Sequence, residues 1–195
     1  MKSSFVLLAV MALVMATLAP AAAQGRGVTV ETQDVLDQGG PAPDDREVYA
    51  HSAATLRRTP NGITAQIQMP TPEPGTYDYP DPDDHPTASE PGHPEAFTLW
   101  VFVFDPEQPA FNPEAGQHWS GAFLGGGHLV GGPNLTLTGH ISKNSEPVAG
   151  LPLENPDVEV HLAIAPHGGL DPDIMPEQIK TPAGGPPMWW IAVFD

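Results

Sequence analysis

The chain has 195 residues, no cysteine, and 24 acidic against 7 basic residues, which gives a formal net charge of −17 at pH 7. A chain this acidic is repelled by nucleic acid and by anionic lipid, so neither is an expected partner. The lack of cysteine excludes disulfides and thiolate metal sites, and leaves the burial of apolar surface as the source of stability.

The first 23 residues have the pattern of a signal peptide. Lys2 supplies the positive start, Phe5–Leu18 is a short apolar run, and Ala21–Ala23 supplies the small residues of a cleavage site. The run is shorter than the about 20 residues of a membrane span, and no second apolar segment of that length follows. We therefore expect a secreted or periplasmic protein after cleavage near Ala23, with no membrane span in the mature chain.

Proline and glycine punctuate the rest of the chain. The 25 prolines and 20 glycines fall mostly between short apolar runs, and no amphipathic helical pattern of about 12 residues is present. This pattern predicts many short strands joined by turns. We expect one all-β domain over residues 49–195, an immunoglobulin-like antiparallel β-sandwich with long Pro/Gly/Asp-rich loops. It follows an N-terminal segment, 24–48, with a possible edge strand at Val28–Val35.

The clearest local signal is a hairpin around Pro60-Asn61-Gly62. Asn-Gly favours a tight turn because both residues tolerate positive φ. The flanking arms are Tyr49–Arg58 and Ile63–Met69. The second arm alternates apolar and polar side chains, which is typical of a half-buried strand.

Residues Pro70–Pro94 differ in kind, because proline recurs there and aliphatic side chains are missing. The acidic residues of this segment include Asp78, Asp81, Asp83 and Asp84. They resemble a calcium loop only loosely, since no glycine follows Asp83 at the position where an EF-hand loop turns. We expect an extended loop, whose role the sequence leaves open.

Three apolar segments follow. Ala96–Phe104 is apolar on both faces and predicts a central strand. Ala122–Val130 and Leu135–Ile141 predict a hairpin across the turn at residues 131–134.

The last third of the chain predicts two more strands. Ser142–Pro156 has the length of a connection between two sheets. Glu159–Gly169 predicts a strand that runs into a Pro-His-Gly-Gly turn at its end. Its apolar and polar residues alternate, so His161 points away from the aliphatic face. Asp171 can cap a short helical turn that ends near Ile179. Met188–Phe194 predicts the closing strand.

Short motifs resemble those of a family of uncharacterised secreted bacterial proteins. GHLVGG at 127–132 is similar to that family's GHVVGG-like turn, and EVHL at 159–162 with His-Gly at 167–168 is similar to its EVHLVVRSHG-like strand. An aromatic strand and the EQI segment at 177–179 also occur here in the same order as in that family. The similarity covers about Tyr49–Ile179, although the cysteines common in that family are absent here. It implies export and a compact β domain, and no reaction.

Histidine is the strongest chemical hint. His140 and His161 both lie on the polar face of a predicted strand, and opposed residues on paired strands have Cβ atoms about 4.5–5.5 Å apart. If those strands are neighbours, the two rings could share a zinc or copper ion, with His128 or His167 as a third ligand. The alternative is that these are surface or hydrogen-bonded histidines.

No catalytic template fits. Ser120 lacks the first glycine of a G-x-S-x-G elbow, H-E-x-x-H is absent, and the Gly125–Gly127 run is not followed by a phosphate-binding lysine. We therefore expect a non-catalytic binding or surface-associated module without a cofactor. Two alternatives stay open: a zinc- or copper-binding protein, and a carbohydrate-binding module that stacks sugar rings on Trp119 or Trp190. The sequence leaves the oligomeric state open.

Overall fold

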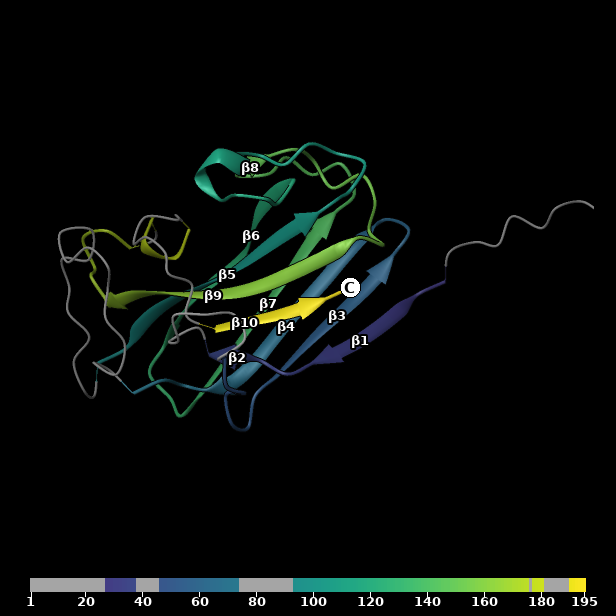
Figure 1. Cartoon of the computed structure of the whole chain (residues 1–195). Helices are drawn as coiled ribbons and strands as arrows, with labels where there is room; N and C mark the ends of the chain where they lie inside the picture. The colour runs from purple at the N-terminus through teal and green to yellow at the C-terminus, as the bar shows by residue number, and fades with distance from the viewer. Residues whose placement is uncertain (1–26, 38–45, 74–92, 176, 181–189) are drawn as a thin grey trace, which may run out of the picture.

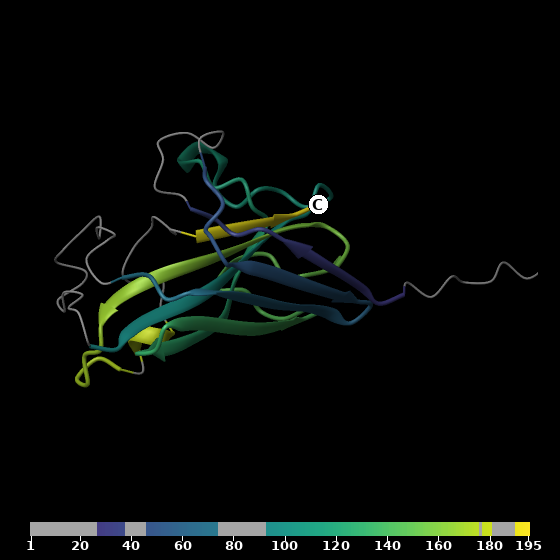
Figure 2. The same ribbon diagram turned by 90° about the horizontal axis from the view of Figure 1, so that it is seen from below.

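The computed structural model describes residues 27–37, 46–73, 93–175, 177–180 and 190–195. The chain forms two antiparallel sheets, of four and six strands, that face each other across one core (Figure 1; Figure 2). The predicted all-β sandwich is therefore confirmed. The leader and the acidic loop residues from Asp78 to Asp84 lie outside the described residues.

The strands and short helices have the following bounds. In spatial order, the four-stranded sheet contains β1 (Thr29–Gln33), β3 (Ala53–Thr59), β4 (Gly62–Pro70) and β7 (Asn134–Ser142). The six-stranded sheet contains β2 (Leu36–Asp37), β10 (Trp190–Phe194), β9 (Glu159–Gly169), β5 (Glu95–Phe104), β6 (Gly121–Val130) and β8 (Ala149–Gly150). Two 3-10 turns are η2 (Pro113–Ala115) and η3 (Glu177–Ile179). None of the helices in the described segments is long and apolar enough to cross a membrane.

The Asn61-Gly62 hairpin is confirmed. β3 and β4 pair from Thr59 opposite Gly62 to Ala53 opposite Gln68. Gly62 has a φ of 145°, a conformation that side chains rarely adopt. The alternation predicted in the second arm places Ile63, Ala65, Ile67 and Met69 in the core.

The core between the sheets consists of aliphatic and aromatic side chains from both layers. Its largest fully buried apolar members are Phe97, Phe194, Leu56, Ile63, Ile67, Met69, Leu99, Leu135, Leu153, Leu162 and Ile164. β5 lies centrally, between β9 and β6, as its apolar character on both faces predicts. The outward face of β5 also carries aromatic rings, among them Trp100 and Phe102.

The N-terminal strand changes sheets. Among the strands of the described segments, β1 pairs with β3 alone, at the edge of the four-stranded sheet, and β2 pairs with β10 in the other sheet. Val35, between them, is fully buried in the core. The backbone amide of Tyr49 donates to the Val35 carbonyl at 2.8 Å, which fixes the crossing point.

The hairpin predicted between residues 122–130 and 135–141 is wrong, although both strands exist. β6 pairs with β5 and β8, whereas β7 pairs with β4 in the opposite sheet. The turn signal specifies a chain reversal and not which sheet receives the second arm. The strands still touch at Gly125 and Gly139, where the two backbones approach closely because neither residue has a side chain.

β9 is longer than its sequence suggests. The predicted turn at Pro166 is absent, and the strand continues to Gly169. A shift in the pairing of β5 between Glu95 and Phe97 lies opposite Pro166. Such a bulge tolerates a proline, since one ladder hydrogen bond is already interrupted there.

The Tyr49 hydroxyl links the stability of the fold to alkaline pH. Its ring packs edge-on against Trp190 with centroids 6.0 Å apart, and burial, followed by the nearby carboxylates of Asp37 and Glu73, raises the pKa of its hydroxyl. The folded state thus holds this proton more tightly than the unfolded chain does. Its contribution to stability is fully present below the unfolded pKa of about 10 and is lost as the pH rises through the raised folded value.

We expect the free energy of unfolding of Tyr49→Phe to fall less steeply with rising pH than that of the wild type above about pH 10. Urea unfolding midpoints, measured from about pH 8 to pH 11 for both proteins, check this result. If the midpoints of the two proteins change with pH in parallel, the Tyr49 hydroxyl does not contribute to the pH dependence of stability.

Candidate functional site

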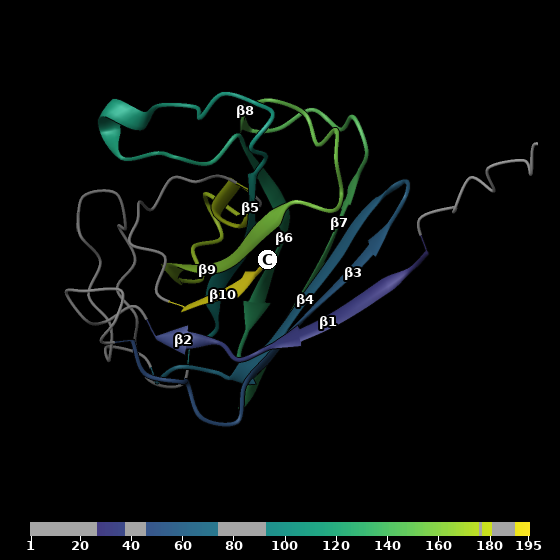
Figure 3. The same ribbon diagram turned by 45° about the vertical axis from the view of Figure 1, so that its right-hand side comes forward.

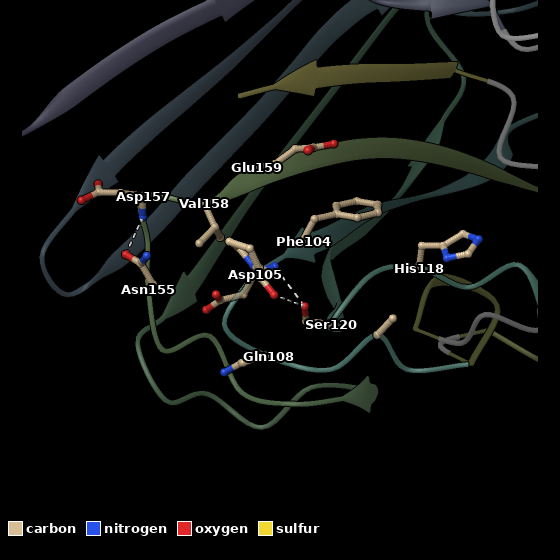
Figure 4. Close-up of a pocket in the computed structure, with 11 residues that line it drawn as sticks. Phe104, Asp105, Gln108, His118, Ser120, Asn155, Asp157, Val158 and Glu159 are labelled. Carbon is tan, nitrogen blue, oxygen red and sulfur yellow. Dashed lines mark hydrogen bonds between the residues drawn. The ribbon is translucent and has the colours of Figure 1, made fainter. Parts of the chain in front are cut away.

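A cleft opens at one end of the sandwich, where β5 ends and β9 begins. Its volume is about 510 Å³. It is lined by Phe104, Asp105, Pro106, Gln108, Ala110, His118, Ser120, Asn155, Asp157, Val158 and Glu159. Figure 4 shows the Phe104 ring drawn between the side chains of Glu159 and His118. We refer to it as the β5–β9 cleft.

Ser120 shapes the wall of this cleft. It is 2 % exposed, and its hydroxyl accepts a hydrogen bond from the Asp105 amide at 2.9 Å and donates to the Asp105 carbonyl at 3.2 Å (Figure 4). The Asp105 carboxylate in turn accepts from the Glu107 amide at 2.9 Å. These bonds hold the turn after β5 in place, so the Ser120 hydroxyl has a structural role.

Arg58 fixes the opposite wall. Its guanidinium is 4 % exposed and donates to the carbonyls of Pro156 and Val158 at 2.8 and 2.5 Å. It also bonds the Glu31 carboxylate at 2.6 Å and the Asp195 carbonyl at 3.2 Å. One buried cation therefore joins the loop before β9 to the first and last parts of the described chain.

The floor of the cleft combines an aromatic ring with a carboxylate. Phe104 and His161 contact each other with ring centroids 4.2 Å apart. His161 Nε2 lies 2.6 Å from a Glu159 carboxylate oxygen, and the side chains of His161 and Glu159 are 22 % and 44 % exposed. His161 therefore points out of the core, as its strand pattern predicts, and it positions a carboxylate that solvent still reaches.

A row of four rings runs alongside the cleft, and we call it the aromatic ladder. Trp100 lies 6.4 Å from Phe102, Phe102 lies 5.8 Å from Trp119, and Trp119 stacks on Phe111 at 4.7 Å, all between ring centroids. Trp100 is 3 % exposed and Phe111 is 48 % exposed, so the ladder runs from the sheet to solvent.

The loop between β5 and β6 carries the outer half of the ladder. The Phe111 amide donates to the Trp119 carbonyl at 2.9 Å, and Asn112 bridges Gln117, so the loop closes on itself around η2. Figure 3 shows this loop reaching beyond the ends of β5 and β6. Ala110 and His118, which precede Phe111 and Trp119 in the chain, line the cleft, so this loop contributes both to the cleft and to the ladder.

The structure does not bring the four candidate histidines together. His140 lies on β7 in the four-stranded sheet and His161 on β9 in the other sheet. His140 has both ring nitrogens within hydrogen-bond distance of hydroxyls, Thr64 at 3.0 Å and Ser142 at 3.2 Å. No group of three or more potential metal ligands occurs among the residues that the structure describes.

The other two histidines lie elsewhere in the six-stranded sheet. His167 is 5 % exposed, and its Nε2 lies 2.7 Å from the Thr98 hydroxyl, which also accepts a hydrogen bond from Trp100. His128 is exposed on β6, opposite Phe97. The zinc or copper hypothesis therefore has no assembled ligand set in the described part of the chain.

The two candidate tryptophans differ sharply. Trp119 is partly exposed and belongs to the aromatic ladder. Trp190 is 3 % exposed and packs in the core against Tyr49 and Phe97. Alternate residues of a strand point to opposite faces, and Trp190 points into the core. Trp190 is therefore not available to stack on a sugar, and the candidates that remain are Trp119 and its ring partners Phe102 and Phe111.

The motif residues gather at the other end of β9, away from the cleft. The Gln178 amide donates to the carbonyls of His167 and Gly169 at 3.0 and 2.7 Å. A Cβ at Gly127 would lie 2.0 Å from the Ile179 carbonyl, so η3 rests directly on β6. The GHLVGG, His-Gly and EQI segments therefore contact one another and hold η3 against the six-stranded sheet.

Sequence reasoning missed most of the cleft residues. The outward rings Phe102 and Phe104 could be found from the alternation of β5, whose inward partners are Val101 and Val103. Phe111 carried no signal, because it lies in a loop without periodicity. The sequence pattern marks Glu159 only as the polar first residue of a strand.

Comparison with family models, with curated proteins and with solved structures found no match to this chain. The resemblance to secreted bacterial proteins thus stays a prediction, and the chemistry of the site has to be derived from its own residues.

Proposed function

We propose that this chain is an exported, non-catalytic binding module that holds a saccharide in the β5–β9 cleft and against the aromatic ladder. The single observation that carries the proposal is the ladder itself. Three of its rings, Phe102, Trp119 and Phe111, are at least partly exposed and contact one another in sequence. Phe102 belongs to β5, and the other two belong to the loop between β5 and β6.

The chemistry of a saccharide matches this surface. A sugar ring has apolar C–H faces that pack on aromatic rings and a rim of hydroxyls that need hydrogen-bond partners. The cleft supplies such partners in the carboxylates of Asp157 and Glu159 and in the amides of Gln108 and Asn155.

The charge of the cleft selects among saccharides. Its described lining contains carboxylates and no lysine or arginine. An anionic sugar would be repelled by Asp157 and Glu159. The cleft therefore favours a neutral or amine-bearing saccharide.

Trp119→Ala is expected to weaken the binding of short neutral oligosaccharides by about tenfold or more, which corresponds to about 1.4 kcal/mol. Truncation removes the central outer ring of the ladder and leaves Phe102 and Phe111 apart. Calorimetric titration of the mature protein with a panel of soluble neutral and amino-sugar oligosaccharides measures the loss.

Val148→Ala is the matched control, since Val148 is 53 % exposed and lies outside the cleft lining. It should bind like the wild type. If the wild type gives no heat with any member of the panel, or if both variants bind equally, the saccharide proposal is refuted.

A further inference from the structure

A second cavity adjoins the β5–β9 cleft, and we call it the Lys143 cavity. Its volume is about 630 Å³. The two cavities share four lining residues, which are Asp105, Gln108, Asn155 and Asp157. Figure 4 draws Asn155 and Asp157 on the side of the cleft away from His118, so the Lys143 cavity extends the cleft in that direction.

The wall that the two cavities share contains a buried carboxylate, that of Asp105. Asp105 is 6 % exposed. Its Oδ1 accepts a hydrogen bond from the Glu107 amide at 2.9 Å, whereas its Oδ2 has no hydrogen-bond or ion-pair partner among the described residues. A buried carboxylate is normally paired with a cation, because the removal of a charge from water is costly. Asp105 thus lacks a counter-charge, at a place where two cavities leave room for one.

The charges around Asp105 point to a cationic ligand. The linings of the two cavities together contain one lysine, Lys143, and five carboxylates, which are those of Asp105, Glu107, Glu154, Asp157 and Glu159. A cation between them is attracted from several sides. The burial of Asp105 strengthens this attraction, because little water is left to screen the carboxylate.

The wall suits an ammonium group better than a metal ion. No group of three or more potential metal ligands occurs in the part of the chain that the structure describes, so a metal ion would be held by too few side chains. An ammonium group needs a single carboxylate for a charge-assisted hydrogen bond. Gln108, in the same wall, supplies a neutral acceptor for a second donor.

We infer that the β5–β9 cleft and the Lys143 cavity form one groove that selects an amine-bearing oligosaccharide, and that Asp105 binds its ammonium group. The inference rests on the saccharide function proposed above and names the class of saccharide. The aromatic ladder packs on the apolar faces of the sugar units. The carboxylate of Asp105 then distinguishes a protonated amino sugar from an uncharged sugar of the same shape.

Asp105→Asn tests the role of this carboxylate. The amide keeps the size of the side chain and an acceptor for the Glu107 amide but removes the charge. Calorimetric titration of the mature protein compares a glucosamine tetramer with its fully N-acetylated form, in a mildly acidic buffer of low ionic strength. We expect the wild type to bind the amine form about tenfold more tightly than the acetylated form, and Asp105→Asn to lose most of this preference.

Asp173→Asn is the matched control, because Asp173 is exposed and lines neither cavity. It removes the same charge from the chain and should keep the preference of the wild type. An equal loss of preference in both variants would attribute the effect to the net charge of the chain and overturn the inference.

Lys143→Met is expected to act in the opposite direction. Lys143 is exposed and repels a cation in the groove, so its removal should tighten the binding of the glucosamine tetramer about threefold. A variant that fails to fold cannot bind more tightly, so this result stands even if circular dichroism shows Asp105→Asn to be unfolded. Unchanged or weaker binding of the tetramer by Lys143→Met overturns the inference.

The same titrations separate the inference from the function on which it rests. If the wild type binds uncharged oligosaccharides and shows no preference for the amine form, the inference is overturned and the saccharide function stands. If the wild type binds no saccharide, both are overturned.

Discussion

Arg58→Met is expected to lower the free energy of unfolding by about 3–5 kcal/mol, because removing one partner of a buried charged network leaves the others unsatisfied. The variant removes the donors for the carbonyls of Pro156 and Val158 and for the Glu31 carboxylate. Methionine fills part of the space but donates no hydrogen bond. Urea unfolding at neutral pH measures the change.

Arg57→Met provides the control for Arg58→Met. The two arginines are neighbours on β3, but Arg57 is exposed on the outward side of the four-stranded sheet while Arg58 is buried. The control should change stability by less than about 0.5 kcal/mol. Equal effects of the two variants would mean that the network around Arg58 contributes little.

Arg58→Met should also loosen the β5–β9 cleft. Pro156 and Val158 belong to the loop before β9, and Val158 lines the cleft. Oligosaccharide affinity is therefore expected to fall under conditions in which the variant is still folded. An unchanged affinity would show that the loop keeps its position without the guanidinium.

Gly139→Ala is expected to destabilise the sandwich by about 3 kcal/mol, the upper part of the range for overpacking. A Cβ at this position would lie 2.5 Å from the Gly125 Cα and 2.6 Å from its carbonyl oxygen. Both contacts are with backbone, so no side chain can rotate away, and β6 and β7 must separate. Thermal and urea unfolding measure the effect.

Gly132→Ala is the control for Gly139→Ala. A Cβ there has no heavy atom within 4 Å. The same chemical change should therefore leave stability nearly unaltered or raise it slightly through the unfolded state. If Gly139→Ala is as stable as Gly132→Ala, the close approach of β6 and β7 is not required for the fold.

Much of the fold could be predicted because the signals that determine it are local. The Asn61-Gly62 turn and the alternation that follows it specify a hairpin within a few residues. β5 is apolar on both faces, so it had to be central. The position of β7 could not be predicted, because its choice between β6 and β4 depends on contacts between residues far apart in the sequence.

The site was less predictable for a related reason. The outward direction of His161 follows from strand parity, but its partners, Phe104 on another strand and Glu159 two residues away, become apparent only in the folded chain. Adjacent tryptophans leave the inward one undetermined until the register is known, and the structure assigns the core to Trp190. Phe111 meets Trp119 only because the loop folds back on itself.

The guanidinium that bonds both Glu31 and Asp195 places these two points of the chain at the same pole of the molecule, beside the loop that flanks the cleft. A tether attached after Asp195 would leave the sandwich from that pole. Immobilising the protein by that end would crowd the β5–β9 cleft, so the direction of anchoring alone should change how well an oligosaccharide is captured.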